Sequence, residues 1–312
     1  MAAADSYLAQ GAVIRSPGDT VRIGAGSAVL ETCVVIGRTT IGARTVFGHR
    51  CMVVGAEIGN LCEIGNGSII MPGARLGDRV FLGEGTLIPP GTVVVDHAVV
   101  VGRPGRTVRR ANDEDLKRLL ELRGGDLTMP TAYELEPVEA TGATMGVTYE
   151  YNGRWPTVAE SAVLFDSAEL TGDIVVGERT IIGAGVKVIG DSHGPVRIGD
   201  DVQILENTVL HLLPHNDLIV EDGVVIGPGC MIHGCHLGAG TIVEPGAIVC
   251  DFSTLGRSCV VRAGAVVKQR SQFDDFAVVD GFPAKQVDSL LHPPPIPDWG
   301  LHLDDVVRLV RR

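Results

Sequence analysis

Two segments of the chain are near-copies of each other, and each keeps a histidine that the other lacks. Residues 45–59 (TVFGHRCMVVGAEIG) align without gaps to residues 224–238 (VVIGPGCMIHGCHLG). His49 in the first segment faces a proline, and His233 in the second faces a valine. Histidine changes its charge near neutral pH and is the commonest metal ligand in proteins. These positions are therefore candidates for proton transfer or metal binding.

An aliphatic residue recurs every six residues around both histidines. The first series runs from Ile23 to Val100, with one step of five at Ile58. The second runs from Leu164 to Val267, is broken by two loops, and has its step of five at Leu237. Glycine often follows the aliphatic residue, as a short strand and a tight turn require. The period predicts two parallel β-helices of hexapeptide repeats, with about 18 residues in a coil of three repeats.

The two series divide the chain into four expected segments. A short β-helix domain is expected over 1–110 and a helix with an acidic linker over 111–157. A second β-helix domain is expected over 158–288, and a Pro-rich tail with a C-terminal helix over 289–312. Asn112 is expected to be the N-cap of the first helix, because its side chain can accept a hydrogen bond from the first turn.

Composition excludes several classes of partner. The net charge of -12 argues against nucleic acid and anionic membranes, because both need a basic surface. No apolar stretch is long enough to span a bilayer, and the N-terminal residues lack the features of a signal peptide. Seven cysteines without paired spacing favour free thiols in a reducing compartment. We therefore expect a cytoplasmic protein that binds neither nucleic acid nor membrane.

The second half resembles the gamma-class carbonic anhydrase family of left-handed β-helix proteins. The resemblance covers residues 155–288 and lies in the stretches GDSHGPVRIGDD, ENTVLH, VIGPGCMIHGCHLG and DGFPAK. The first half is similar to a shorter, more divergent member, and it also resembles the left-handed-helix subunits of dynactin. The resemblance implies an all-β fold of two left-handed parallel β-helices with short flanking α-helices. It also implies a homotrimer in which three histidines bind zinc between two subunits, leaving one position for water.

His211 and His233 match the two ligands that one subunit gives in this family. They lie 22 residues apart in the sequence, which is one coil plus a four-residue loop, so they are expected on the same edge of adjacent coils. The position of the neighbouring subunit's ligand holds Pro228, whose side chain has no donor atom for zinc.

Three further histidines are alternatives for the missing ligand. His193 and His215 lie in loops close to the matched pair, so each is a candidate third ligand within the second half. His49 occupies the neighbour's ligand position in the first half, so a composite site between the halves is another alternative. The remaining alternative is that each half lost its ligands independently and binds no metal.

The resemblance also implies three candidate catalytic residues, Asp191, Gln203 and Glu206. Asp191 keeps its place, but the arginine that precedes it in the family is Ile189 here. Gln203 and Glu206 stand where the family has an asparagine and an aspartate, and the family's glutamine between them is a leucine. Loss of groups that support a metal site typically lowers activity 10–100-fold. We therefore expect weak or absent hydration of carbon dioxide.

Two other function classes fit the same repeats, because one fold can carry unrelated activities. The chain is also similar to hexapeptide acyltransferases, which use acyl-CoA and often a loop histidine as general base. His215 would take that role. The third class is a non-catalytic trimeric scaffold. The small-molecule substrate is not defined by the sequence in any of these cases.

Overall fold

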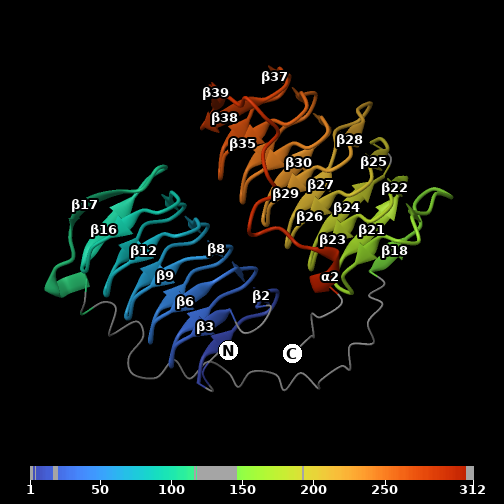
Figure 1. The fold of residues 1–312 in the computed structure, drawn as a ribbon. Helices are drawn as coiled ribbons and strands as arrows, with labels where there is room; N and C mark the ends of the chain where they lie inside the picture. Colours follow the sequence, from blue (N-terminus) through green and yellow to red (C-terminus); the bar gives the residue numbers. More distant parts are fainter. Residues whose placement is uncertain are drawn as a thin grey trace. The chain divides into compact units, whose positions relative to one another are not determined.

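The computed structural model consists of short parallel strands stacked in coils (Figure 1). It describes residues 3, 5–16, 20–115, 117, 146–191 and 193–306. The chain divides into two compact units, unit 1 (residues 1–139 and 311–312) and unit 2 (residues 140–310). Among the described residues, no sheet contains strands from both units.

In each unit every third strand pairs with the next, so three parallel sheets form the three sides of a coil. The strands of unit 1 are β1 (Tyr7–Leu8), β2 (Val13–Arg15), β3 (Val21–Ile23), β4 (Ala28–Val29), β5 (Val34–Ile36), β6 (Thr39–Ile41), β7 (Val46–Phe47), β8 (Met52–Val54), β9 (Glu57–Ile58), β10 (Glu63–Ile64), β11 (Ile69–Ile70), β12 (Arg75–Leu76), β13 (Phe81–Leu82), β14 (Leu87–Ile88), β15 (Val93–Val94), β16 (Ala98–Val101) and β17 (Arg106–Arg110).

Unit 2 repeats the arrangement with more coils. Its strands are β18 (Val147–Tyr149), β19 (Thr157–Val158), β20 (Val163–Leu164), β21 (Glu169–Gly172), β22 (Ile174–Val176), β23 (Ile181–Ile182), β24 (Lys187–Gly190), β25 (Val196–Ile198), β26 (Gln203–Ile204), β27 (Val209–His211), β28 (Leu218–Val220), β29 (Val225–Ile226), β30 (Met231–His233), β31 (His236–Leu237), β32 (Ile242–Val243), β33 (Ile248–Val249), β34 (Thr254–Leu255), β35 (Val260–Val261), β36 (Val266–Val267), β37 (Gln272–Phe273), β38 (Ala277–Gly281) and β39 (Ala284–Ser289).

The six-residue series of the sequence is the core of both units, as predicted. Its members from Ile23 to Val100 form one buried cluster, and those from Leu164 to Val267 form the other. The glycine after a core residue leaves room for the next coil: a side chain on Gly42 would meet the backbone of Gly59 at 2.6 Å. The fold class expected from the period, all-β with parallel β-helices, is confirmed.

Buried hydroxyl groups join neighbouring coils at their corners. Thr241 donates its Oγ1 hydrogen to the carbonyl oxygen of Gly256 at 2.9 Å and accepts the N–H of Cys259 at 3.1 Å. Its side chain is 0% exposed. Equivalent pairs of bonds are made by Ser27, Thr45, Thr180 and Thr208. The hydroxyl residues at these five corners therefore satisfy backbone groups that would otherwise be buried without a partner.

Antiparallel hairpins close the last coil of each unit. Strand β17 pairs with β16 in unit 1, and β39 pairs with β38 in unit 2. After β17, Asn112 Oδ1 accepts the N–H of Asp115 at 2.9 Å and Asp115 returns the bond, which is the expected N-cap. Most of the predicted helix that follows lies outside the described residues.

The C-terminal region holds the short helix α2 (Leu303–Val306), and the rest of the predicted helix lies outside the described residues.

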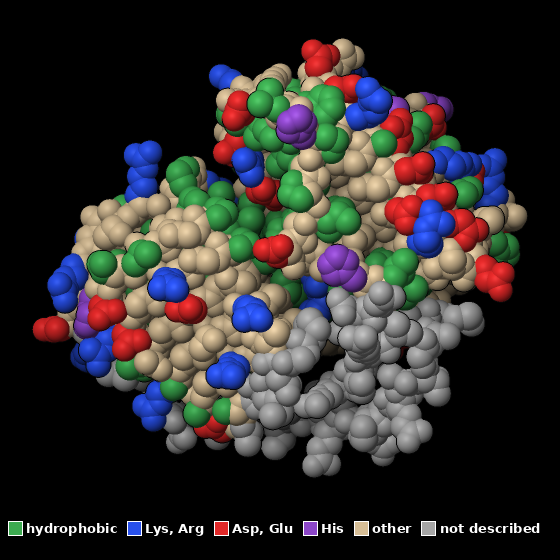
Figure 2. All heavy atoms as spheres, viewed as in Figure 1, with side chains coloured by type: hydrophobic (Ala, Val, Ile, Leu, Met, Phe, Trp, Pro, Cys, Tyr) green, Lys and Arg blue, Asp and Glu red, His purple; other side chains and the backbone are tan. Residues whose placement is uncertain are grey.

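Among the described helices, none is long and apolar enough to cross a bilayer. On the face in view in Figure 2, acidic and basic side chains are interspersed.

The coils of unit 2 begin earlier than the six-residue series does. Strand β18 lies within the stretch 111–157 that was expected to be linker, and it pairs in parallel with β21. A short hairpin in which Tyr151 pairs with Arg154 follows β18 and interrupts the period. The hairpin explains why the sequence shows no repeat there. The boundaries of the four segments remain predictions.

The corner bonds lead to a stability prediction for Thr241→Val. This change keeps the side-chain volume but leaves the Cys259 N–H and the Gly256 carbonyl buried without this partner, at a cost of about 1–3 kcal/mol. Urea unfolding followed by circular dichroism measures the loss. Thr254→Val is the matched control, because Thr254 is exposed on β34 and its change should cost less than about 0.5 kcal/mol. Equal losses in the two variants would contradict a stabilising role for the corner hydroxyl.

Candidate metal centre

The candidate centre lies where three neighbouring strands of unit 2 end at the same corner. His211 and His233 are the last residues of β27 and β30, and they are directly paired in the sheet register. Asp191 follows the end of β24, the strand on the other side of β27 (Figure 1). Because the strands are in register, residues far apart in the sequence are brought onto one edge of the sheet.

Asp191, His193 and His211 form a cluster whose ligand atoms all lie within 4.8 Å of one another. Asp191 Oδ2 is 3.4 Å from His211 Nε2, and Asp191 Oδ1 is 3.6 Å from His193 Nδ1. The three side chains are between 22% and 35% exposed, so an ion and a water molecule can reach them. Two imidazoles and one carboxylate are the ligands of many zinc sites with an open fourth position, so the donor set fits zinc.

Two contacts fix the position of His193 in the loop after β24. Its N–H donates to Asp191 Oδ1 at 2.8 Å, and its ring Nδ1 lies 3.1 Å from the carbonyl oxygen of Leu212. The Leu212 carbonyl can accept a hydrogen from a protonated Nδ1, and in that tautomer Nε2 would be the nitrogen that binds a metal. Metal-binding histidines commonly make such a bond with their second nitrogen.

His233 lies beside this cluster but is not part of it. Its ring is 5.5 Å from the ring of His211 in an edge-on contact, and its Nδ1 is 3.1 Å from Asp251 Oδ2. The Asp251 side chain is only 4% exposed, and its Oδ1 accepts the Leu213 N–H at 2.9 Å and an Asn216 amide hydrogen at 3.3 Å. Asp251 therefore connects His233 to the loop that follows His211.

Sequence reasoning missed Asp251, although a signal was present. It lies 18 residues after His233, which is one coil, so it reaches the same edge one coil later. The sequence favoured His211 and His233 as the ligand pair. The structure also groups His211 with Asp191 and His193, which the sequence named as a catalytic candidate and an alternative ligand, and the ligand pair of His211 and His233 stays a prediction.

Two predicted catalytic residues lie away from the cluster. The amide of Gln203 is used by the C-terminal region: it donates to the Leu301 carbonyl and accepts the Leu301 N–H, each at 2.7 Å. Glu206 is 1% exposed in the turn between β26 and β27, at the opposite end of β27 from His211. Pro228 lies at this same end, since the N–H of the next residue, Gly229, bonds to the Glu206 carbonyl.

The remaining histidine candidates have different surroundings. His215 is exposed in the loop after β27, with φ at +62°, and its N–H donates to the His193 carbonyl at 3.0 Å. His49 belongs to unit 1, where its Nδ1 lies 2.8 Å from Glu31 Oε2 and its side chain is 54% exposed. Within its own unit, His49 is therefore a surface ion-pairing residue.

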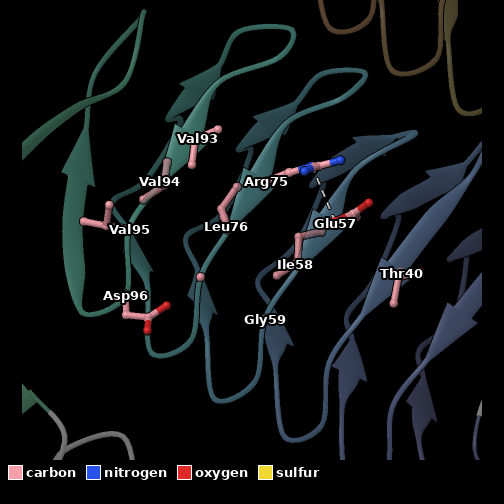
Figure 3. A pocket seen from close by; sticks show the side chains of 11 residues that line it. Thr40, Glu57, Ile58, Gly59, Arg75, Leu76, Val93, Val94, Val95 and Asp96 are labelled. Carbon is pink, nitrogen blue, oxygen red and sulfur yellow. Dashed lines mark ion pairs between the residues drawn. The ribbon is translucent and has the colours of Figure 1, made fainter.

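Neither the cysteines nor the surface depression over unit 1 extends the centre. Burial raises the pKa of the Cys230 thiol to about 12, as expected for a core residue rather than a ligand. Figure 3 shows the depression, which lies over β9, β12 and β15 of unit 1. An ion pair between Glu57 and Arg75 crosses it, and neither histidine nor cysteine lines it.

The stacked coils and the histidine–aspartate cluster define a class: a β-helix protein with a candidate metal centre at one strand edge. A family model described as "Bacterial transferase hexapeptide (six repeats)" matches residues 55–90. The chain is a hexapeptide-repeat protein of the left-handed β-helix type.

Comparison with individual proteins gives partial matches. A carbonic anhydrase of Geobacillus kaustophilus is 37% identical over 108 residues, which are 35% of this chain and 59% of that protein. The carnitine operon protein CaiE of Escherichia coli K12 is 29% identical over 139 residues, 45% of this chain and 70% of CaiE. The crystal structure of a putative acetyltransferase from Bacillus cereus is 32% identical, covers 46% of this chain and 83% of its own, and has a TM-score of 0.45.

The contacts of Asp251 generate a prediction for the loop after His211. Asp251→Ala removes the acceptor of the Leu213 N–H and of the Asn216 amide. The free energy needed to open the loop should therefore fall by about 1–3 kcal/mol. Amide hydrogen exchange at Leu213 measures this change. Asp217→Ala removes an exposed carboxylate of the same loop and should leave the exchange rate unchanged. Unaltered protection in Asp251→Ala would show that the loop is held by other contacts.

Proposed function

We propose that unit 2 is a carbonic-anhydrase-like domain with an altered zinc site, held within one chain by Asp191, His193 and His211. The observation that carries the proposal is the cluster itself, in which two ring nitrogens and a carboxylate oxygen converge within 4.8 Å. A tetrahedral zinc would draw these atoms to roughly 3.4 Å from one another. Since all three side chains are partly exposed, such a shift displaces no core residue.

A zinc ion bound there would supply Lewis-acid chemistry, polarising a water molecule or a carbonyl oxygen. The protein's part is to fix the ligands. Asp191 orients His193 through its backbone N–H, and the Leu212 carbonyl favours the Nδ1-protonated tautomer of the same ring. Beside the cluster, Asp251 holds His233 against His211. Because the three side chains are partly exposed, a bound ion would have a fourth position open to a water molecule or a substrate.

We further propose that carbon dioxide hydration by this site is weak or absent. The carboxylate of Asp191 serves as a ligand in this arrangement and is not available to a reacting water. Ile189, directly before Gly190 and Asp191, adds an apolar side chain where the resemblance implies an arginine. Gln203 is occupied by the C-terminal region, and Glu206 is buried at the far end of β27. These changes remove the polar partners that the resemblance implies for the reacting molecule.

A homotrimer is part of this proposal, by similarity to the anhydrase family. The neighbour's ligand is missing at Pro228, and the in-chain cluster removes the need for it. Trimer formation and metal binding are thereby separate properties of this protein.

The in-chain site makes a prediction about zinc content. Wild-type protein purified without a histidine tag should hold about one zinc per chain, whereas Asp191→Asn and His211→Ala should lose at least tenfold in zinc affinity. Atomic absorption after dialysis against graded chelator measures it. His236→Ala is the control, because His236 pairs with Glu221 on another side of unit 2.

Pro228→His separates the in-chain site from a site shared between subunits. An in-chain site keeps its zinc affinity in this variant, because Pro228 lies at the other end of its strand from the cluster. A gain of tenfold or more in zinc affinity, together with full zinc binding by Asp191→Asn, would contradict the proposal and favour His211 and His233 as the ligand pair.

Activity gives a second prediction. Zinc-loaded protein should hydrate carbon dioxide at less than roughly 10⁴ s⁻¹, about 1% of the carbonic anhydrase rate. Stopped-flow measurement with a pH indicator decides this, with a competent carbonic anhydrase measured in parallel. A faster rate would show that the missing polar partners are supplied by groups not in this cluster.

An acyltransferase is the second candidate, because the matching family model is described as a bacterial transferase. His215 is exposed on the loop beside the cluster, where a general base can reach a bound substrate. Binding of acetyl-coenzyme A that is lost in His215→Ala supports this candidate. A chain that binds neither zinc nor acyl-coenzyme A fits the scaffold alternative.

A further inference from the structure

A tyrosine-bearing hairpin lies in the same sheet as the metal cluster. The chain has four tyrosines and two tryptophans, and three of these six residues fall between positions 149 and 155. Tyr149 is 46% exposed, Tyr151 is 37% exposed and Trp155 is 60% exposed. Because aromatic residues are otherwise scarce and large exposed apolar groups often mark binding sites, this concentration indicates a binding surface.

The sheet register aligns the hairpin with the cluster. Tyr149 pairs with Thr171, which pairs in turn with Ile189. Val188 pairs with Leu210, so Ile189 and His211 occupy the next matched position of β24 and β27. Side chains at matched positions share one face of a sheet. A single row of the sheet, labelled β18, β21, β24 and β27 in Figure 1, therefore leads from the tyrosines to the metal ligands.

Tyr151 lies closer to the cluster than Tyr149 does. A side chain on Gly172 would meet the Cβ of Tyr151 at 3.2 Å, so Tyr151 packs over this glycine. Gly172 pairs with Gly190, the residue before Asp191. Neighbouring strands are about 4.8 Å apart, which places Tyr151 roughly 10 Å from the level of His211. The matched positions between Tyr151 and His211 hold two glycines and Ile189, so these side chains add no charge, and backbone packs closely over both glycines.

An ion-pair network fixes the hairpin to the sheet. Arg154, the partner of Tyr151 across the turn, pairs with Asp173 Oδ2, and Arg197 pairs with Asp173 Oδ1 at 2.9 Å. Arg197 and Arg154 hold the pKa of the Asp173 carboxyl below its usual value, so the network is charged at neutral pH. The backbone that carries the tyrosines is therefore fixed in the absence of a ligand. This lowers the entropic cost of ligand binding.

We infer that Tyr149 and Tyr151 form a subsite for the aromatic ring of an organic carbonyl compound, such as an ester or amide, whose carbonyl lies at the metal cluster. The inference rests on the proposed zinc site and names its substrate class. A tyrosine face binds a flat apolar ring well, and Ile189 contacts the uncharged chain that joins ring to carbonyl. The spacing of roughly 10 Å requires a linker of several methylene groups. A compound as small as carbon dioxide would use none of this surface.

The test measures how ligand length and the tyrosines affect affinity. Acetohydroxamate, phenylacetohydroxamate and phenylpentanohydroxamate carry the same zinc-binding head, and only the last reaches Tyr151. Calorimetric titration of the zinc-loaded protein should give at least tenfold tighter binding for phenylpentanohydroxamate than for acetohydroxamate. In Tyr149→Ala/Tyr151→Ala this gain should fall at least fivefold, while the affinity for acetohydroxamate stays the same. Tyr149→Phe/Tyr151→Phe keeps both rings and should keep the gain. Tyr7→Ala, in unit 1, is the control.

Zinc content measured on the same samples separates the two proposals. If zinc is bound and the gain with chain length is absent, or survives in the double alanine variant, the aromatic subsite is overturned and the zinc site stands. If no zinc is bound, the proposed function has failed, and phenylpentanol, which lacks a metal-binding head, replaces the hydroxamates. Binding of phenylpentanol that requires the tyrosine rings then supports the subsite alone, and tyrosine-independent binding or none overturns it.

Discussion

The stacking of one coil on the next is the constraint on which this protein depends. Neighbouring coils approach closely where glycine follows the core residue, and at several corners a small hydroxyl residue accepts a bond from the next coil and donates one to it. A coil buries its apolar edge only against the coils beside it, so stability is a sum of neighbour contacts. The capping hairpins β16–β17 and β38–β39 end each stack by pairing a final antiparallel strand.

Stacking also determines where chemistry can occur. Core residues face inward, so functional side chains are restricted to outward positions of the strands and to the loops at corners. The register then sets their spacing at about 4.8 Å for each coil. In unit 2 this brings His211 onto His233 and puts Asp191 at the end of the strand alongside. The regular stacking of the strands therefore places His211 and Asp191 in the cluster. The irregular loop after β24 adds His193.

Regular features were predictable from the sequence, and irregular ones were not. The six-residue series identified the core from Ile23 to Val267 because an inward residue is required at every strand. The spacing of His211 and His233 gave their pairing for the same reason. By contrast, the position of the His193 ring depends on a loop in which its Nδ1 lies 3.1 Å from the Leu212 carbonyl oxygen, and no period encodes that contact. The bond between Gln203 and Leu301 joins residues 98 positions apart across an aperiodic tail.

The histidines that distinguish the two near-copies stand at opposite ends of equivalent strands. His49 precedes β8 and pairs with Glu31, whereas His233 ends β30 and pairs with Asp251. At the end of β30 that corresponds to the position of His49, unit 2 has Pro228 close to a buried Glu206. The exposed ion pair of unit 1 is therefore absent there. A strand separates the two ends within any one coil. Within one unit the two positions therefore cannot meet, and each unit has kept a histidine at a different edge of the same repeat, where it makes a different contact.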